Sequence, residues 1–332
     1  MFRFGVFGVS HFAVSKMIPA IQAGGDITVH AVASRDAAKA AATARALGIP
    51  KSYGSYEDLL ADPDVDAVYN PLPNHLHVPW SERAAAAGKH VLCEKPIGLG
   101  AAEARRLLAA RDQGGVVICE AAMVRVHPRW LAARELIRKG KIGEMGAFVG
   151  TFGYDLSARR ENVRFDPQMG GGVLLDVGFY PVTMSRFCFD DEPIAVAAQM
   201  ERQSDAGVDV MTSAILRFPR GHATFSVGMH LAPQQRAQIL GSKGHIDLIH
   251  AWNPASDQPS HLLLETSGQL ESSEAARIEF PPVNQYTILA QLFARAAATG
   301  GPAPILLEDS IKNMAALDAL RRSAASGRWE TV

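Results

Sequence analysis

The sequence has few cysteines, almost no net charge and no long apolar run, and each shortage excludes a class of protein. Cys93, Cys119 and Cys188 are far apart and outside any CxxC spacing, which predicts buried thiols and no metal site. No segment approaches the roughly 18 apolar residues that a membrane span needs. The 33 basic and 34 acidic residues give a formal charge of -1, with no basic run interleaved with aromatics. We therefore expect neither a membrane nor a nucleic acid as partner.

The composition that is present is that of an ordinary globular protein. Of the 332 residues, 48% are hydrophobic and 20% charged, and this length allows about two domains at roughly 150 residues each. The first residues turn glycine-rich at Gly5 and Gly8, too early for the apolar centre of a secretory signal, and no small-residue cleavage site follows. These features predict a cytoplasmic location.

The two parts of the chain have different hydrophobic patterns. Up to residue 121, short apolar strands alternate with helical segments, which predicts a doubly wound parallel α/β sheet. Beyond residue 122, closely spaced strand-like runs predict a second, α+β domain with an open, mainly antiparallel sheet, ending in a helix over 308–325. The polar stretch 255–274 is expected to be an irregular surface excursion.

A turn between the first strand and the first helix matches a degenerate dinucleotide fingerprint. In the pattern G-x-G-x-x-G/A, the places of the small residues are taken by Gly8, Ser10 and Ala13, with His11 and Phe12 completing the turn. The serine departs from the pattern, yet its hydroxyl could bond a phosphate at the helix N-terminus. This turn predicts a cradle for a dinucleotide.

The end of the second strand predicts which dinucleotide binds. Ser34 and Arg35 come first, and Lys39 lies one helical turn later, so a 2′-phosphate would meet a hydroxyl and two cations. This favours NADP. Asp36 keeps NAD as the alternative, because an acid at this place holds the ribose 2′-hydroxyl of NAD.

Two further strand ends carry candidates for chemistry. Lys95 directly follows an apolar strand, and at this place in an open α/β sheet side chains face a ligand cleft. An ordinary charged surface turn would have the same sequence pattern. The preceding strand ends in a proline-stiffened polar loop, in which the histidines could equally be structural. The loop residues expected to contact the cofactor are Pro71, Leu72, Asn74 and His77.

The glycine-rich segment 170–181 supplies the candidates of the second domain. If it is a helix, Asp176 and Tyr180 lie four residues apart on one face, while Pro181 should kink or interrupt that helix. An aspartate bonded to backbone and a packed tyrosine are the structural alternative.

These motifs together resemble the glucose-fructose oxidoreductase, inositol dehydrogenase and rhizopine-catabolism (Gfo/Idh/MocA) family over almost the whole chain. The pieces that carry the resemblance are the glycine turn and the segments 73–77, 87–96, 170–180, 240–244 and 326–328. The resemblance implies an N-terminal Rossmann domain and a C-terminal open sheet that often builds oligomers, here a homodimer or homotetramer.

The resemblance also implies roles for individual residues. Lys95 would be the catalytic lysine, and Glu94 and Asn74 would contact the nicotinamide-side ribose. His77 would lie beside the nicotinamide and is expected, with Asp176 and Tyr180, to be among the catalytic residues. Many relatives have an aspartate and a histidine at the places of Asp176 and Tyr180. The tyrosine resembles the branch of NADP-dependent D-xylose dehydrogenases and trans-dihydrodiol dehydrogenases, in which either Lys95 or Tyr180 could carry the proton.

The sequence thus predicts an NADP(H)-dependent oxidoreductase that moves a hydride between nicotinamide and a sugar, polyol or cyclic diol. The alternative is a regulatory protein of the same fold that binds dinucleotide and sugar without turnover. Arg125, Arg164 and Tyr286 are the residues expected to line the substrate pocket.

Overall fold

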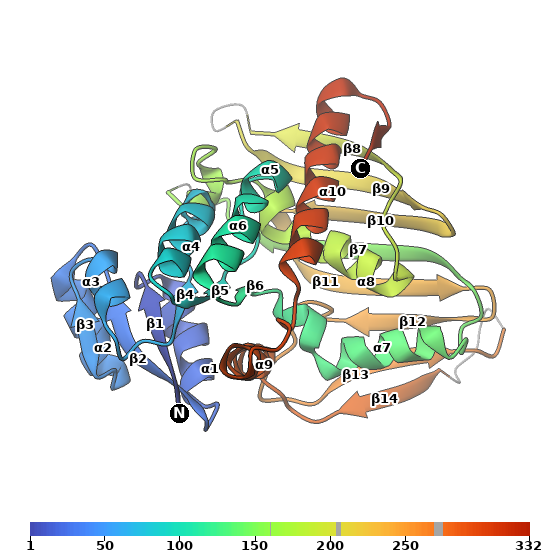
Figure 1. Cartoon of the computed structure of the whole chain (residues 1–332). Coiled ribbons are helices and arrows are strands. Elements are labelled where there is room, and N and C mark those ends of the chain that lie inside the picture. The colour runs from blue at the N-terminus through green and yellow to red at the C-terminus, as the bar shows by residue number, and fades with distance from the viewer. Residues whose placement is uncertain (160, 204–206, 269–274) are drawn as a thin grey trace. The chain divides into compact units, whose positions relative to one another are not determined.

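The computed structural model describes residues 1–159, 161–203, 207–268 and 275–332. They form two compact units, the first made of Met1–Met123 and Asn284–Met314, the second of Val124–Val283 and Ala315–Val332. Figure 1 labels the elements of both. The sequence had placed one boundary at residue 121, whereas here Asn284–Met314 groups with the N-terminal part.

The first unit is built on a six-stranded sheet, and the predicted parallel, doubly wound arrangement is confirmed. The strand order is β3-β2-β1-β4-β5-β6, that of a Rossmann fold. The order of the strands reverses between β1 and β4, and ligands bind at this point in such sheets. The central strands are almost fully buried because helices cover both faces. The strands are β1 Phe2–Phe7, β2 Ile27–Ala33, β3 Lys51–Tyr53, β4 Ala67–Asn70, β5 His90–Cys93 and β6 Ile118–Glu120.

Helices connect these strands, and their ends follow the sequence. The second helix begins where Asp36 accepts the N–H of Lys39, and it ends at Gly48, whose φ is 65°. The helical elements of this unit are η1 Ala13–Met17, α1 Ile18–Gln22, α2 Ala37–Leu47, α3 Tyr56–Ala61, η2 Asn74–Leu76, α4 His77–Ala86, α5 Ala101–Ala104, α6 Arg106–Gly114 and α9 Gln285–Thr299.

The second unit contains a nine-stranded sheet in the order β14-β13-β12-β11-β7-β10-β9-β8-β15. Adjacent strands run antiparallel except β10 and β7, which pair in parallel, so the prediction of a mainly antiparallel sheet is confirmed. The strands are β7 Met145–Asp155, β8 Ala195–Arg202, β9 Asp209–Phe218, β10 Gly221–Gly228, β11 His230–Gly241, β12 Gly244–Ile249, β13 Ser260–Glu265, β14 Ala276–Phe280 and β15 Glu330–Thr331.

Part of the expected surface excursion 255–274 is a strand, so that prediction was wrong for β13. Leu262 is fully buried there and pairs with Ile278 of β14. The polar residues around this strand made the stretch look irregular in the sequence. Only one face of the strand packs on the core, so its apolar pattern is weak. Residues 269–274 of the same stretch lie outside the described residues.

Helices cover one face of this sheet and form its core. Every residue of α8, Phe179–Phe189, is buried, and Gly150 of β7 lies so close to it that a Cβ there would be 2.9 Å from Pro181 Cβ. The rings of Trp130 and Trp252 stack at 5.6 Å beneath these elements. The other helical elements are η3 Met123–Val126, α7 Pro128–Arg138, η4 Val163–Phe165, η5 Leu174–Gly178 and α10 Leu307–Ser326, which starts in the first unit; the helix predicted over 308–325 is thereby confirmed.

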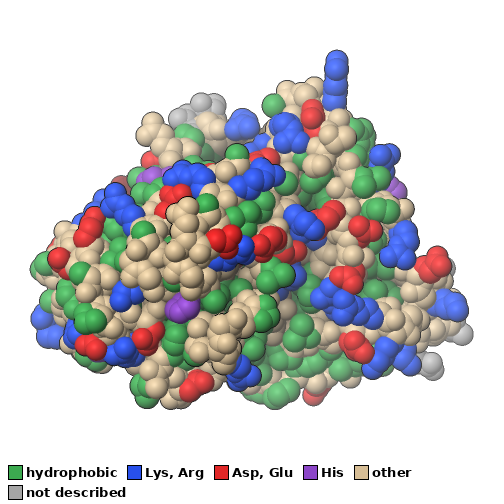
Figure 2. Space-filling view, in the orientation of Figure 1, with side chains coloured by type: hydrophobic (Ala, Val, Ile, Leu, Met, Phe, Trp, Pro, Cys, Tyr) green, Lys and Arg blue, Asp and Glu red, His purple; other side chains and the backbone are tan. Residues whose placement is uncertain are grey.

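The surface agrees with the balanced charge of the sequence. Figure 2 shows acidic and basic side chains interspersed over the visible face. Among the described residues, none of the helices has the length and apolarity that crossing a membrane requires. Cys93, Cys119 and Cys188 are buried free thiols, as predicted, and burial raises the pKa of Cys119 and of Cys188 to about 12.

Candidate active site

The turn after β1 has a backbone conformation that favours glycine. Gly8 has a φ of 75°, its N–H donates to Ala33 O at 2.7 Å, and a Cβ there would lie 3.3 Å from Leu72 Cδ2. The Ser10 hydroxyl accepts the N–H of Ala13 at 3.2 Å, so it lies at the start of the helix. The turn therefore presents backbone and a hydroxyl at a helix N-terminus, which suits an anion.

A hydroxyl residue and two exposed cationic residues follow the carboxyl end of β2 in the chain. Arg35 and Lys39 are exposed, and the Ser34 hydroxyl accepts the N–H of Asp36 at 3.2 Å. The carboxylate of Asp36 has local partners, because Oδ1 accepts the Lys39 N–H at 3.0 Å and Oδ2 lies 3.8 Å from Lys39 Nζ. Asp36 thus acts as the cap of α2, and Arg35 and Lys39 provide exposed positive charge next to it in the chain.

The loop after β4 is organised by a buried histidine. His77 is 1% exposed, and its Nδ1 and Nε2 each lie 2.7 Å from a backbone carbonyl, of Pro96 and Leu72 respectively. The two carbonyls favour the imidazolium, but burial outweighs them and lowers the pKa of His77 to about 4. Both ring nitrogens face protein carbonyls, and a neutral ring can donate to only one of them. We therefore revise the predicted catalytic role of His77 to a structural one.

The other residues of this loop range from fully buried to partly exposed. Asn70, at the end of β4, is fully buried and donates from Nδ2 to His77 O at 3.1 Å. Pro71 and Asn74 are partly exposed, Leu72 is 8% exposed, and Asn74 begins the short helix η2. These three predicted cofactor residues thus follow the strand at the sheet edge where ligands bind.

Glu94 and Lys95 follow β5 at the same edge of the sheet. Glu94 Oε1 accepts the hydroxyl of Tyr69 at 2.7 Å, and its Oε2 accepts the N–H of Lys95 at 3.2 Å. Tyr69 is fully buried, and burial together with the charge of Glu94 raises its pKa well above the ordinary value, so it remains a donor. This arrangement fixes the orientation of the Glu94 carboxylate.

The segment after Lys95 is held from the next strand. The Lys95–Pro96 peptide bond is cis, and the following N–H, of Ile97, donates at 2.7 Å to Oε1 of Glu120 at the end of β6. Glu120 is 2% exposed. A buried carboxylate therefore fixes the backbone immediately beyond the lysine.

In the second unit, Asp176 is the centre of a polar cluster. Its Oδ2 accepts both the Tyr154 hydroxyl and the Arg164 Nε–H, each at 2.6 Å. Asp176 lies in η5, a π-helical segment, and its side chain is 12% exposed. The three residues come from a strand, a short 3-10 helix and a π-helix, so they meet only in the folded chain.

Tyr180 lies one turn further on, in α8. The residue is 4% exposed, and the centroid of its ring lies 5.6 Å from that of Phe152 and 6.0 Å from that of Trp252. The helix is not interrupted at Pro181, which lies inside α8; the π-helix η5 precedes it and changes to α-helix at Phe179. Asp176 and Tyr180 thus lie on either side of this change in helix type.

Family models match two segments of this chain, and known proteins match nearly its whole length. A model described as "Oxidoreductase family, NAD-binding Rossmann fold" matches residues 2–121, and one described as "GFO/IDH/MocA C-terminal domain" matches residues 130–247. The chain belongs to the Gfo/Idh/MocA oxidoreductase family. It is therefore a member of a family of NAD(P)-dependent dehydrogenases and reductases acting on CH–OH groups, and its first unit is an NAD(P)-binding Rossmann domain.

Relatives in this Gfo/Idh/MocA family cover the chain end to end. An uncharacterised oxidoreductase of Rhizobium meliloti is 42% identical over 99% of both chains. The NADP-dependent D-xylose 1-dehydrogenase 2 of Haloferax volcanii is 35% identical over 98% of both. Among solved structures, a 3-ketoreductase from Actinomadura kijaniata in complex with NADP and TDP-benzene is 30% identical, with a TM-score of 0.90 over 97% of both chains.

The three residues predicted to line the substrate pocket have different surroundings in this Gfo/Idh/MocA chain. Tyr286 belongs to the first unit, where its ring meets Phe12 of the glycine turn edge-on at 5.6 Å. Arg125 lies in the second unit with its guanidinium 4.6 Å over the Phe187 ring. Arg164 is paired with Asp176. His11, also predicted at the cofactor, is exposed.

Four residues next to the predicted site had not been singled out in the sequence. They are Tyr69, Glu120, Tyr154 and Trp252. Tyr69 and Glu120 end or nearly end parallel strands, so the rule that led to Lys95 could have found them. Tyr154 and Trp252 carry no such signal, because their partners are fixed only by the packing of the second unit.

A cluster of His30, Asp62 and Asp64 in the first unit has atoms within 4.8 Å of one another, the spacing of a metal site. However, Lys51 Nζ lies 3.1 Å from Asp62 Oδ1 and 2.8 Å from Asp64 Oδ2. The ammonium already supplies the positive charge between these carboxylates, so we read the cluster as a structural ion-pair network.

Proposed function

We propose that this chain is an NADP(H)-dependent oxidoreductase acting on a sugar, polyol or cyclic diol. The observation that carries the proposal is the set of polar groups at the carboxyl ends of β1, β2 and β5: the Gly8 turn, Arg35 with Ser34, and Lys95 behind Glu94. Relatives named as an NADP-dependent D-xylose 1-dehydrogenase and as a trans-1,2-dihydrobenzene-1,2-diol dehydrogenase support the substrate class.

In this proposal the protein orients the reactants and moves one proton. The nicotinamide, when bound, supplies the hydride chemistry. The Gly8 turn and Ser10 would hold the diphosphate, Arg35 and Lys39 the 2′-phosphate, and Glu94 and Asn74 the ribose next to the nicotinamide. Oxidation of an alcohol also releases the hydroxyl proton, for which general acid–base groups are needed.

Two side chains could carry this proton, Lys95 and Tyr180, and Asp176 would orient them. Tyr180 enters this scheme as a rigid group, because the rings of Phe152 and Trp252 fix its orientation.

A screen of aldoses, inositols and diols with NADP and with NAD tests this function. We expect reduction of NADP by at least one of these substrates, measured by absorbance of the reduced nicotinamide. The rival function is a regulatory protein that binds dinucleotide and sugar without turnover. Binding of NADP and a sugar by calorimetry, with no reduction across the whole screen, would favour that rival.

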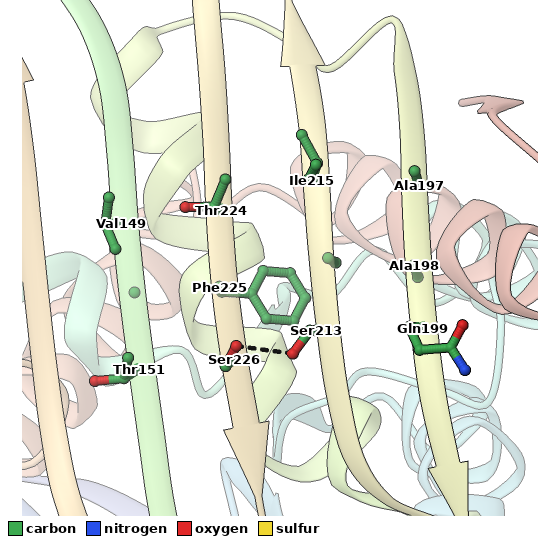
Figure 3. A pocket seen from close by; sticks show the side chains of 12 residues that line it. Val149, Thr151, Ala197, Ala198, Gln199, Ser213, Ile215, Thr224, Phe225 and Ser226 are labelled. Carbon is green, nitrogen blue, oxygen red and sulfur yellow. Dashed lines mark hydrogen bonds between the residues drawn. The ribbon is translucent and has the colours of Figure 1, made fainter.

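We also propose that the chain forms a homodimer or homotetramer through the nine-stranded sheet. A hollow on the sheet is lined by apolar, hydroxyl-bearing and other small side chains, together with Gln199, from four strands, β7 to β10, as Figure 3 shows. They include Val149, Thr224 and Ile215, which is 40% exposed. Val149 and Thr151 flank Gly150, which contacts α8, so by the pleat they point to the opposite face of the sheet. Ile215→Asp should lower the mass measured by sedimentation, and an unchanged mass would contradict this interface.

A further inference from the structure

We propose that Tyr154 and Arg164 are positioning residues that fix the carboxylate of Asp176 by two bonds to the same oxygen. This inference rests on the proposed function, in which Asp176 orients the proton carriers. It also changes the role of Arg164, which the sequence had suggested as a substrate contact.

The cluster has the geometry of a strong, charge-assisted pair of hydrogen bonds. The Tyr154 hydroxyl and the Arg164 Nε–H each donate at 2.6 Å to Asp176 Oδ2. Two donors that approach one oxygen from different elements restrict rotation of the carboxylate. In both bonds Asp176 is the acceptor, so its carboxylate is held in one orientation by groups from two other elements.

Arg164 is itself held on both its backbone and its side chain. Its carbonyl accepts the N–H of Gly172 at 2.9 Å, and a Cβ on Gly171 would lie 2.4 Å from that oxygen. Asn162 Oδ1 accepts from Arg164 N at 3.1 Å and from Nη1 at 3.3 Å. The glycine run therefore allows the close approach that brings Arg164 to Asp176.

The electrostatics keep both donors protonated. Burial and the charge of Asp176 raise the pKa of Tyr154, and the charge of Asp176 raises the pKa of Arg164. Tyr154 therefore remains a phenol that donates, and this separates its role from that proposed for Tyr180.

The test compares two tyrosines that make the same kind of bond in different places. Tyr154→Phe removes only the hydroxyl that meets Asp176. Tyr53→Phe removes a hydroxyl that donates to Asp62 Oδ2 at 2.9 Å, in the first unit, and serves as the matched control. With NADP and the substrate selected by the screen, Tyr154→Phe should lower kcat by about 10- to 100-fold, the worth of a hydrogen bond to a charged group, and leave both KM values within about threefold. Tyr53→Phe should keep the wild-type kcat.

A double-mutant cycle tells positioning from an independent role. In the Asp176→Asn background, Tyr154→Phe should cause no further loss of kcat, because the group it positions is already altered. The full loss in that background, or a rise in KM alone, would overturn the inference. If Asp176→Asn itself keeps the wild-type kcat, the role proposed for Asp176 fails first, independently of Tyr154.

Arg164→Lys and crystal structures complete the test. Arg164→Lys keeps the positive charge, so it should retain a larger fraction of the wild-type kcat than Arg164→Ala does. A crystal structure of Tyr154→Phe, which needs no substrate, should show the Asp176 carboxylate rotated or spread over two orientations, and that of Tyr53→Phe should not. An unmoved carboxylate in both would contradict the proposal.

Discussion

The two units hold their polar candidates in different ways. In the first unit many of the partners are backbone groups: Gly8 bonds Ala33 O, His77 faces two carbonyls, and Glu94 accepts the N–H of Lys95 as well as the Tyr69 hydroxyl. In the second unit the partners are other side chains, such as Tyr154 and Arg164 around Asp176. Backbone groups are present whatever the sequence, whereas a side-chain partner must be a particular residue at a particular place.

This difference explains how the two units tolerate change. A site held by backbone depends on the shape of the strand ends, which glycine, proline and small residues determine. A site held by side chains depends on several distant positions at once. We therefore expect substitutions in the first unit to affect one contact each, and substitutions in the second to disturb the whole cluster.

Lys95→Met gives the largest expected effect and tests whether chemistry depends on the first unit. If Lys95 exchanges the substrate proton, kcat should fall by about 10² to 10⁴, the usual worth of general acid–base catalysis, with NADP affinity within a few-fold. Stopped-flow or steady-state reduction of NADP with a substrate from the screen measures it. Near wild-type turnover would indicate that Lys95 is only a charged residue of a surface turn, and it would favour Tyr180 as the proton carrier.

Gly172→Ala tests the glycine entry to the second cluster. Its φ is 106° and a Cβ would lie 2.1 Å from Asp209 Oδ1, whose carboxylate holds Leu174 N through Oδ2 at 2.7 Å. We expect the free energy of unfolding to fall by about 3 kcal/mol from strain and overlap together. Gly140→Ala, at a φ of 66° with nothing within 4 Å of the added Cβ, is the control and should cost about 1 to 2 kcal/mol. If urea unfolding shows the same loss of stability for Gly172→Ala and Gly140→Ala, the structure relieves the overlap with Asp209 by a small shift.

The sequence predicted the first unit better than the second, because side-chain partners from distant positions are harder to predict than the ends of strands. The parallel sheet, its glycine turn and the place of Lys95 follow from alternating strands and helices and from the rule that ligands meet the carboxyl ends of strands. The strand β13 and the partners of Asp176 do not follow, because a half-buried strand and a side-chain cluster are decided by packing. His77 illustrates a different limit, since a histidine at a predicted cleft gives no sign of whether its ring nitrogens face solvent or carbonyls.

The buried state of His77 predicts how stability depends on pH. Its pKa in the fold is about 4, below the ordinary 6.5, so between these values the unfolded chain binds a proton that the folded chain does not. The free energy of unfolding should therefore decrease as pH falls from 6.5 to 4, by up to about 1.4 kcal/mol per pH unit from this residue.

The wild type and His77→Asn compared by urea unfolding at several pH values isolate this contribution. His127, whose pKa burial also lowers to about 4, provides the matched variant His127→Asn. The slope against pH should become smaller in each variant. If His77→Asn keeps the wild-type slope, or if wild-type stability rises in acid, the two carbonyls hold an imidazolium, and the neutral ring is excluded.

Arg35→Ala is the smallest expected effect and tests whether the first unit responds one contact at a time. A charge-assisted bond to phosphate contributes about 1.5 to 3 kcal/mol, so loss of Arg35 should weaken NADP by roughly tenfold or more. NAD has no 2′-phosphate, and Asp36 still caps α2 through the Lys39 N–H, so NAD affinity should change little. Arg45→Ala removes a positive charge from the last turn of the same helix and controls for the general field. Calorimetric titration of both cofactors into the three proteins measures the difference; an equal loss for NAD and NADP in Arg35→Ala would show that Arg35 supports the shape of the strand end and not the phosphate.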